Sequence, residues 1–244
     1  MKNLLRGIAT LGLITIVGGL WWMYNSLDAQ IASAIRRYGP DITGVPVSLS
    51  DAKTDLVDGR AALHGLVVGN PEGFRTAHAL SLGEISMTLD IGSLTTDVIR
   101  IKELTLIKPE ITYEYAGGGS NLDVLQRNIE RSIGRQDDKR KNSRESESGK
   151  KLVIEHLYIK NGTARVSVEL LDGDAVQVPI PDMHLRDIGK KSNGTTAGEA
   201  TRQVLGSLVP QVSTAVASLG VNVAGKTIQK GMETATQTIK DLFK

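Results

Sequence analysis

An uncharged, mostly apolar run over residues 7–24 constrains this chain more than any other feature of its sequence. As a helix rising 1.5 Å per residue, the run would be about 27 Å long, close to the roughly 30 Å core of a bilayer. Basic residues precede it and aromatic residues close it, which is typical of a cytoplasmic flank and a far-side aromatic belt. These residues are Lys2 and Arg6 before the run, and Trp21, Trp22 and Tyr24 at its end. We therefore expect residues 1–24 to form a cytoplasmic flank and a single membrane-spanning helix.

A cleaved signal peptide is the alternative, because Ala32-Ser33-Ala34 resembles a cleavage site. The polar stretch of residues 25–33 separates this site from the apolar run by more than a normal cleavage region allows. The length and flanks of the run therefore favour an uncleaved anchor, with almost all of the chain on the non-cytoplasmic side.

The composition beyond the anchor is that of a folded protein, with 40% hydrophobic and 23% charged residues. The 29 basic and 27 acidic residues leave a net charge of only +2. This balance gives no support to a nucleic-acid partner. The absence of cysteine excludes disulfides and thiolate metal sites.

The region after the anchor divides into helical and strand-like segments. Apolar residues near helical spacing predict a juxtamembrane helix over residues 25–40, which Gly39-Pro40 should end. From residue 45 the apolar residues alternate with period two and are enriched in β-branched types, which indicates strands. Ser120 with Asp123 is a helix-start signal, so residues 45–134 are expected to form a β-rich module with a short inserted helix.

An internal repeat links two strand-like segments at an offset of 53 residues. The first copy is Ile101, Leu104, Leu106, Ile111, Tyr113 and Tyr115, and the second is Ile154, Leu157, Ile159, Ala164, Val166 and Val168. The middle of each copy carries a turn signal, Lys108-Pro109 or Asn161-Gly162, which predicts paired antiparallel strands. The fold class expected is α+β, with a curved antiparallel sheet that continues over residues 152–190.

The remaining segments are a charged linker and a helical tail. Residues 135–151 have almost no apolar side chains, so we expect a flexible linker there. Helical spacing over residues 196–244 predicts C-terminal amphipathic helices, with Pro210 kinking or breaking the first. A stripe on the second should pack on the sheet, a sister chain or the membrane surface; it consists of Ile228, Met232, Ile239 and Leu242.

The chain offers little that points to catalysis. Its four histidines have no metal-ligand spacing such as H-E-x-x-H, and Asp51, Asp55 and Asp58 lack the glycine and terminal glutamate of a calcium loop. We therefore expect no enzyme activity, no cofactor and no metal site.

Several motifs resemble the amino-terminal module of the AsmA family. They are GRAALHGLVVGNPEGF at residues 59–74, LGEI at 82–85, IRIKELTLIKPEI at 99–111 and GSNL at 119–122. The resemblance covers the anchor and residues 45–171. It implies one helix in a bacterial inner membrane with a cytoplasmic amino terminus, and a periplasmic, curved β-sheet with a hydrophobic inner face. Larger relatives, including TamB and chorein-type bridge-like proteins, are implicated in moving phospholipid.

The resemblance and the alternating pattern together suggest a short module that handles lipid and maintains the envelope through a hydrophobic β-groove. The side chains expected to hold an acyl chain, of phospholipid or another lipid, are Leu80, Leu82, Ile85, Met87, Leu89, Ile99, Ile101, Ile154 and Val166. A non-enzymatic envelope scaffold, which binds partner proteins or self-associates as a homo-oligomer, remains open as the second interpretation. An apolar face must be covered by something, and lipid, the helices and a second sheet are the available covers.

Overall fold

The computed structural model describes residues 27–116, 119–142, 150–167 and 176–218. Within them the chain is α+β, with one curved ten-stranded sheet and three α-helices. The strands are β1 (Val47–Ser48), β2 (Asp51–Asp55), β3 (Arg60–Gly69), β4 (His78–Leu89), β5 (Val98–Ala116), β6 (Gly119–Ser120), β7 (Lys151–Lys160), β8 (Gly162–Ser167), β9 (Val176–Ile180) and β10 (Met183–Ile188). A short 3₁₀ helix, η1 (Ile91–Thr95), joins β4 to β5.

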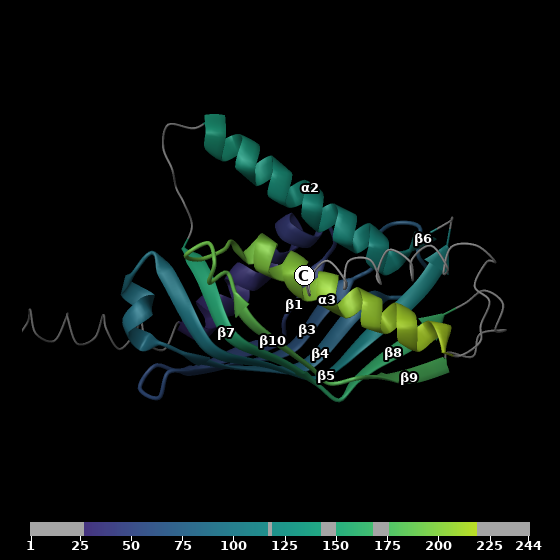
Figure 1. Cartoon of the computed structure of the whole chain (residues 1–244), viewed down its shortest axis with the longest axis horizontal. Helices are drawn as coiled ribbons and strands as arrows, with labels where there is room; N and C mark the ends of the chain where they lie inside the picture. The colour runs from purple at the N-terminus through teal and green to yellow at the C-terminus, as the bar shows by residue number, and fades with distance from the viewer. Residues whose placement is uncertain (1–26, 117–118, 143–149, 168–175, 219–244) are drawn as a thin grey trace, which may run out of the picture.

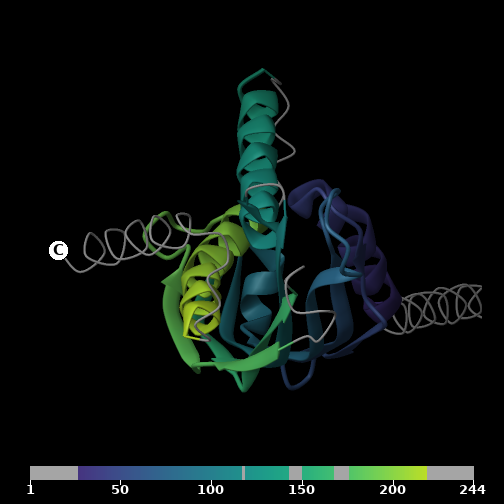
Figure 2. The same cartoon turned by 90° about the vertical axis from the view of Figure 1, so that its right-hand side faces the viewer.

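The helices are helix 27–43, α2 (Asn121–Asn142) and α3 (Ala197–Ala217). Figures 1 and 2 show helix 27–43 and α3 on opposite flanks of the concave side of the sheet. The α2 helix crosses above them, and its far end projects away from the sheet. The concave apolar face is therefore covered by helices on both flanks.

The sheet is mixed, so the prediction of an antiparallel sheet is wrong at its centre. The main strand order is β1-β3-β4-β5-β7-β10, and β5 pairs with β7 and then with β8 in parallel. The parallel register joins Ile101 to Ile154 and Tyr113 to Val166, which is the offset of 53 residues seen in the sequence. The two copies of the repeat therefore lie side by side instead of forming two hairpins.

The residues interpreted as turns instead form a crease across the sheet. Gly65 faces Gly83, Gly83 faces Lys108, and Lys108 faces Asn161, and the ladder pairing lapses at each. Gly65, Lys108 and Asn161 have positive φ angles of 63°, 51° and 55°. In each strand, the alternation of inward-facing side chains shifts by one residue at this line. In β4, Leu80 and Leu82 face inward before the crease, and Ile85 and Met87 face inward after it. The crease thus keeps apolar side chains on the concave face while the sheet bends.

The main core fills the space between the sheet, α2 and α3. Leu125 and Ile129 of α2, Val212 and Val216 of α3, and Val166 of β8 are each no more than 1% exposed. A second cluster lies under helix 27–43, where Ala32 packs with residues of β2, β3 and β4. The domain is stabilised mainly by aliphatic burial, as the low aromatic content predicts.

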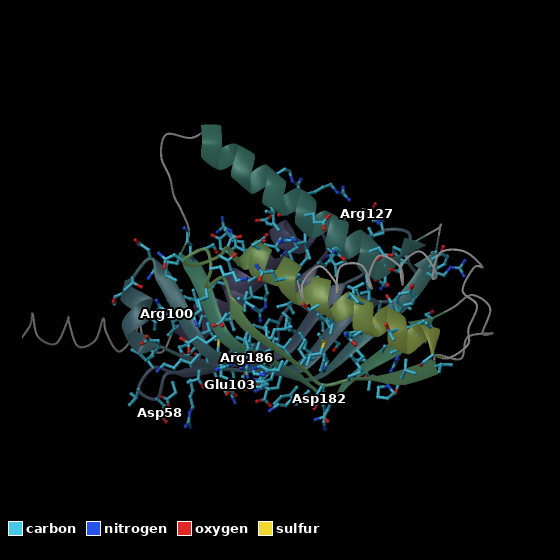
Figure 3. The ribbon with its side chains drawn as sticks, viewed as in Figure 1. Asp58, Arg100, Glu103, Arg127, Asp182 and Arg186 are labelled. Carbon is cyan, nitrogen blue, oxygen red and sulfur yellow. The ribbon has the colours of Figure 1, made fainter. Side chains whose placement is uncertain are left out.

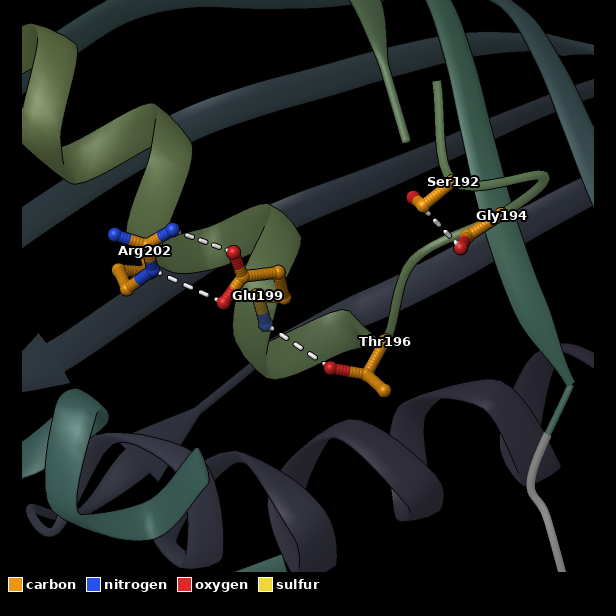
Figure 4. Close-up of polar contacts among 5 residues, drawn as sticks. All are labelled: Ser192, Gly194, Thr196, Glu199 and Arg202. Carbon is orange, nitrogen blue, oxygen red and sulfur yellow. Dashed lines mark hydrogen bonds and ion pairs between the residues drawn. The ribbon is translucent and has the colours of Figure 1, made fainter. Parts of the chain in front are cut away.

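Two helix starts follow from local sequence. Ser120 and Asp123 exchange side-chain to backbone hydrogen bonds of 3.1 and 3.2 Å, which confirms the predicted capping box of α2. Thr196 caps α3 by accepting a 3.1 Å bond from the Glu199 amide, and Glu199 also pairs with Arg202 (Figure 4). The Arg202 hydrogen bond lowers the pKa of Glu199 against the opposing effect of burial.

Two predicted boundaries are wrong, and Pro210 does not break α3. Helix 27–43 runs through Pro40, which sits in its last turn, where Gly44 donates to the Pro40 carbonyl at 2.8 Å. The α2 helix reaches Asn142, so the first half of the expected linker 135–151 is helical. The α3 helix also continues through Pro210 to Ala217. The carbonyl that Pro210 leaves without a partner belongs to exposed Gly206, where water can satisfy it.

The predicted membrane span over residues 7–24 lies outside the described residues, as do the stripe residues Ile228, Met232, Ile239 and Leu242. Among the residues that the structure describes, no helix is long and apolar enough to cross a membrane.

Candidate functional site: an apolar strip between two helices

The nine predicted groove residues fall into two groups in the fold. Five are buried in the core: Leu82 at 3% exposure, Ile85 at 7%, Ile101 at 9%, Ile154 at 4% and Val166 at 0%. Four are half-buried: Leu80, Met87, Leu89 and Ile99. The expected groove is thus filled by helices over much of its surface, and only part of the apolar face keeps access to solvent.

Four half-buried side chains contact both core clusters, and we call them the apolar strip. They are Leu80 and Met87 of β4 and Leu104 and Leu106 of β5. One cluster lies under helix 27–43 and the other under α2 and α3. The strip therefore lies on the part of the sheet between helix 27–43 and α3. Leu104 and Leu106 were not among the predicted groove residues, although they belong to the internal repeat.

The geometry of the strip follows from the pairing of β4 with β5. Met87 lies opposite Leu104, and Leu106 lies opposite the buried Ile85. Leu80 and Met87 are seven residues apart in β4, which corresponds to about 23 Å of extended strand. One leaflet of a bilayer core is about 15 Å thick, so the strip is long enough for one acyl chain.

A hollow of about 420 Å³ lies on the convex side of β2, β3, β4 and β5, opposite the apolar strip. This volume lies in the usual range of small-molecule sites, about 300–1,000 Å³. Its lining includes the side chains of Lys53, Asp55, Arg60, Ser86 and Glu103, which share the convex face. This polar hollow is therefore separate from the apolar strip.

A buried polar network holds the loop after β3 against the end of β5 that contains Glu114. Glu114 is buried, with only 5% of the residue exposed. It accepts from the Arg75 amide at 2.6 Å, from the Thr76 amide at 2.8 Å and from the Thr76 hydroxyl. Burial alone would raise the pKa of Glu114, but these hydrogen bonds outweigh it and lower the pKa.

The same network reaches the start of α2 through Asn121, which is fully buried. Its side chain accepts from the Glu114 amide at 3.0 Å and donates to Asn70 and to the Thr112 carbonyl, both at 2.8 Å. Asn70 belongs to the GNPEGF motif that carried the family resemblance. The motif therefore has a structural role here, holding the loop and α2 against β5.

Among the described residues there is no group of three or more His, Cys, Asp or Glu side chains placed to hold a metal ion. His64 pairs with Asp51 at 3.3 Å. His156 and His184 lie together on neighbouring strands, which their separation in the sequence did not reveal.

No family model matches this chain, and no curated protein matches it. The AsmA resemblance therefore stays a prediction that rests on the motifs quoted above.

Proposed function

We propose that this chain is a non-catalytic, membrane-anchored protein of the bacterial envelope that holds one acyl chain of a phospholipid along the apolar strip. Its anchor is the run of residues 7–24 in the inner membrane, with the amino terminus in the cytoplasm and the sheet in the periplasm. The observation that carries the proposal is the strip itself, four aliphatic side chains left half-buried between two covering helices.

The energetics favour an aliphatic occupant. Burying a methylene group is worth about 0.8 kcal/mol, so a chain that buries half a dozen such groups gains several kcal/mol before its ordering is counted. The strip offers contact to Leu80, Met87, Leu104 and Leu106 without displacing either helix.

The packing of helix 27–43 supports an uncleaved chain. Ile31 and Ala32 precede the possible cleavage site after Ala34, and both pack on the cluster that contains Leu49 and Leu63. Cleavage after Ala34 would remove them and expose those two leucines. An uncleaved, anchored chain keeps the whole of helix 27–43, which borders one side of the strip.

A scaffold function is the second candidate, and a specific observation favours it. The helices already bury most of the apolar face, including Ile154 and Val166. A sheet covered in this way is stable without lipid, and its exposed strand edges and projecting α2 remain available to partner proteins or to a second copy.

The test is the lipid that the full-length protein retains after purification, measured by mass spectrometry. We expect Met87→Glu to reduce phospholipid per chain at least about tenfold, because a charge on the strip must be desolvated by an acyl chain. The matched control is Ser86→Glu, one residue away and facing the other side of β4. It should retain lipid at the wild-type level.

Two outcomes oppose the proposal. A wild-type chain that carries no phospholipid in excess of the detergent-exchanged background favours the scaffold. Equal lipid loss in Met87→Glu and Ser86→Glu, with both variants folded by circular dichroism, places any lipid elsewhere.

A further inference from the structure

Two histidines and a tyrosine form a cluster on the convex face of the sheet, which none of the helices in the described part of the chain covers. In β7, Leu157 and Ile159 point into the core, so the alternating His156 and Tyr158 point to the convex side. His184 lies opposite Tyr158 in β10 and is exposed. In Figure 3 the neighbouring Asp182 lies at this lower side of the sheet, away from α2 and α3.

The two imidazole rings meet through their nitrogen atoms. His156 Nδ1 lies 3.1 Å from His184 Nε2. The Tyr158 ring stacks on His184, with ring centroids 4.2 Å apart and planes 17° apart. Lys160 lies 5.0 Å from the centre of the Tyr158 ring. Stacking restricts the orientation of the His184 ring although the residue is exposed.

The separation of the two nitrogens matches that of two adjacent ligands on one metal ion. With metal to nitrogen bonds of about 2.05 Å, two ligands at angles of 90° to 109° lie about 2.9–3.3 Å apart. The observed 3.1 Å falls in this range. A hydrogen bond between neutral rings also explains this distance, and a shared ion would replace that bond.

The surroundings are compatible with a cation. Glu103 of β5 lies opposite His156 in the parallel register, and Arg186 of β10 lies opposite it on the other side. One carboxylate thus offsets one guanidinium around the pair. Imidazole favours borderline first-row ions such as Zn²⁺ and Cu²⁺ over Mg²⁺, which prefers oxygen ligands.

We propose that His156 and His184 bind one Zn²⁺ or Cu²⁺ ion per chain on the convex face, with the remaining coordination positions taken by water. The site is independent of the apolar strip, because it lies on the opposite side of the sheet. Its open positions make it a point where an external ligand can join the ion.

Isothermal titration of the full-length, tag-free protein in detergent micelles with ZnCl₂ tests this proposal. We expect one Zn²⁺ per wild-type chain and no heat from MgCl₂. The His184→Ala variant should bind Zn²⁺ at least about tenfold more weakly, since losing a ligand costs more than losing an outer-shell partner. His78→Ala, a histidine at the start of β4, is the matched control and should bind like the wild type.

His156→Ala gives an independent check, and it should weaken Zn²⁺ binding as His184→Ala does. Circular dichroism establishes that each variant is folded. The proposal is overturned if the wild type binds no Zn²⁺, if His184→Ala binds as tightly as the wild type, or if His78→Ala loses as much affinity as His184→Ala.

Discussion

The concave face of the sheet has two regions that look alike in sequence and differ in the fold. Under α3, Val166 is fully buried and Ile154 is 4% exposed, with Val212 of α3 fully buried against them. Between the helices, Met87 and Leu104 are only half-buried. Both regions alternate aliphatic side chains with period two. The difference teaches that a strand pattern specifies an apolar face but not what covers it.

The largest expected effect comes from a charge in the covered region. Val166→Asp places a carboxylate with no partner beneath α3, and we expect it to lower the free energy of unfolding by more than about 4 kcal/mol. Most or all of the domain's stability would then be lost. Chemical denaturation followed by circular dichroism measures this. A folded variant of nearly wild-type stability would mean that the α3 side is as open as the strip.

The next effect concerns the polar network that holds α2 and the loop over one end of the sheet. Glu114→Gln removes the charge that accepts hydrogen bonds from Arg75, Thr76 and Asn70, and we expect a loss of about 2–3 kcal/mol. Glu110 in the same strand is the control, because its carboxylate pairs with Arg165 at the surface, 2.6 Å away. Glu110→Gln should cost less than about 1 kcal/mol.

The Glu114 effect should depend on pH in a defined direction. Its pKa is lowered in the folded state from an ordinary 4.5, so the unfolded chain takes up a proton first as the pH falls. The stabilisation by Glu114 is complete above about pH 4.5 and is lost as the pH falls through the lowered pKa. The stability difference between wild type and Glu114→Gln should therefore shrink on acidification. A difference that stays constant from pH 7 to pH 3 contradicts the assigned role.

A smaller effect is expected at the crease, which passes through both regions. Gly65 has a φ of 63°, and a Cβ there would lie 2.3 Å from Ser50 Oγ. Gly65→Ala should cost about 1–3 kcal/mol. Its cross-strand neighbour Gly83 has open space for a Cβ, so Gly83→Ala should change stability by less than about 0.5 kcal/mol. Equal costs at the two glycines would remove the crease as a structural requirement.

The smallest effect on stability is expected in the strip. Met87→Glu can turn its carboxylate toward solvent from a half-buried position, so it should cost about 1 kcal/mol or less. Thermal unfolding of Met87→Glu and of Val166→Asp, measured in parallel, gives the contrast directly. Similar losses in the two variants would make the strip part of an ordinary core.

The sequence alone was sufficient for the elements that depend on local patterns. The α+β class, the strand-rich region after residue 45 and the capping box at Ser120 and Asp123 are confirmed. The α3 helix is confirmed within the predicted segment 196–244, although Pro210 does not break it. These features depend on neighbours a few residues apart, which the sequence displays.

The predictions that failed concern features set by contacts between residues far apart in the sequence. Lys108-Pro109 and Asn161-Gly162 look like turns, but each lies within a run of strand that follows its neighbour in parallel. The shift of phase from Leu80 and Leu82 to Ile85 and Met87 was a visible signal of the crease. Which aliphatic residues the helices cover, and that His156 meets His184, follow only from tertiary packing.

Site-specific photo-crosslinking in living cells tests the central claim most directly. A photoreactive residue at Leu104 faces the strip, and the same residue at Glu103 faces the convex side of the same strand. The account predicts a phospholipid adduct, identified by mass spectrometry, at Leu104 and at most a trace at Glu103. Absence of phospholipid at Leu104, or equal labelling at both positions, would contradict an acyl chain in the strip.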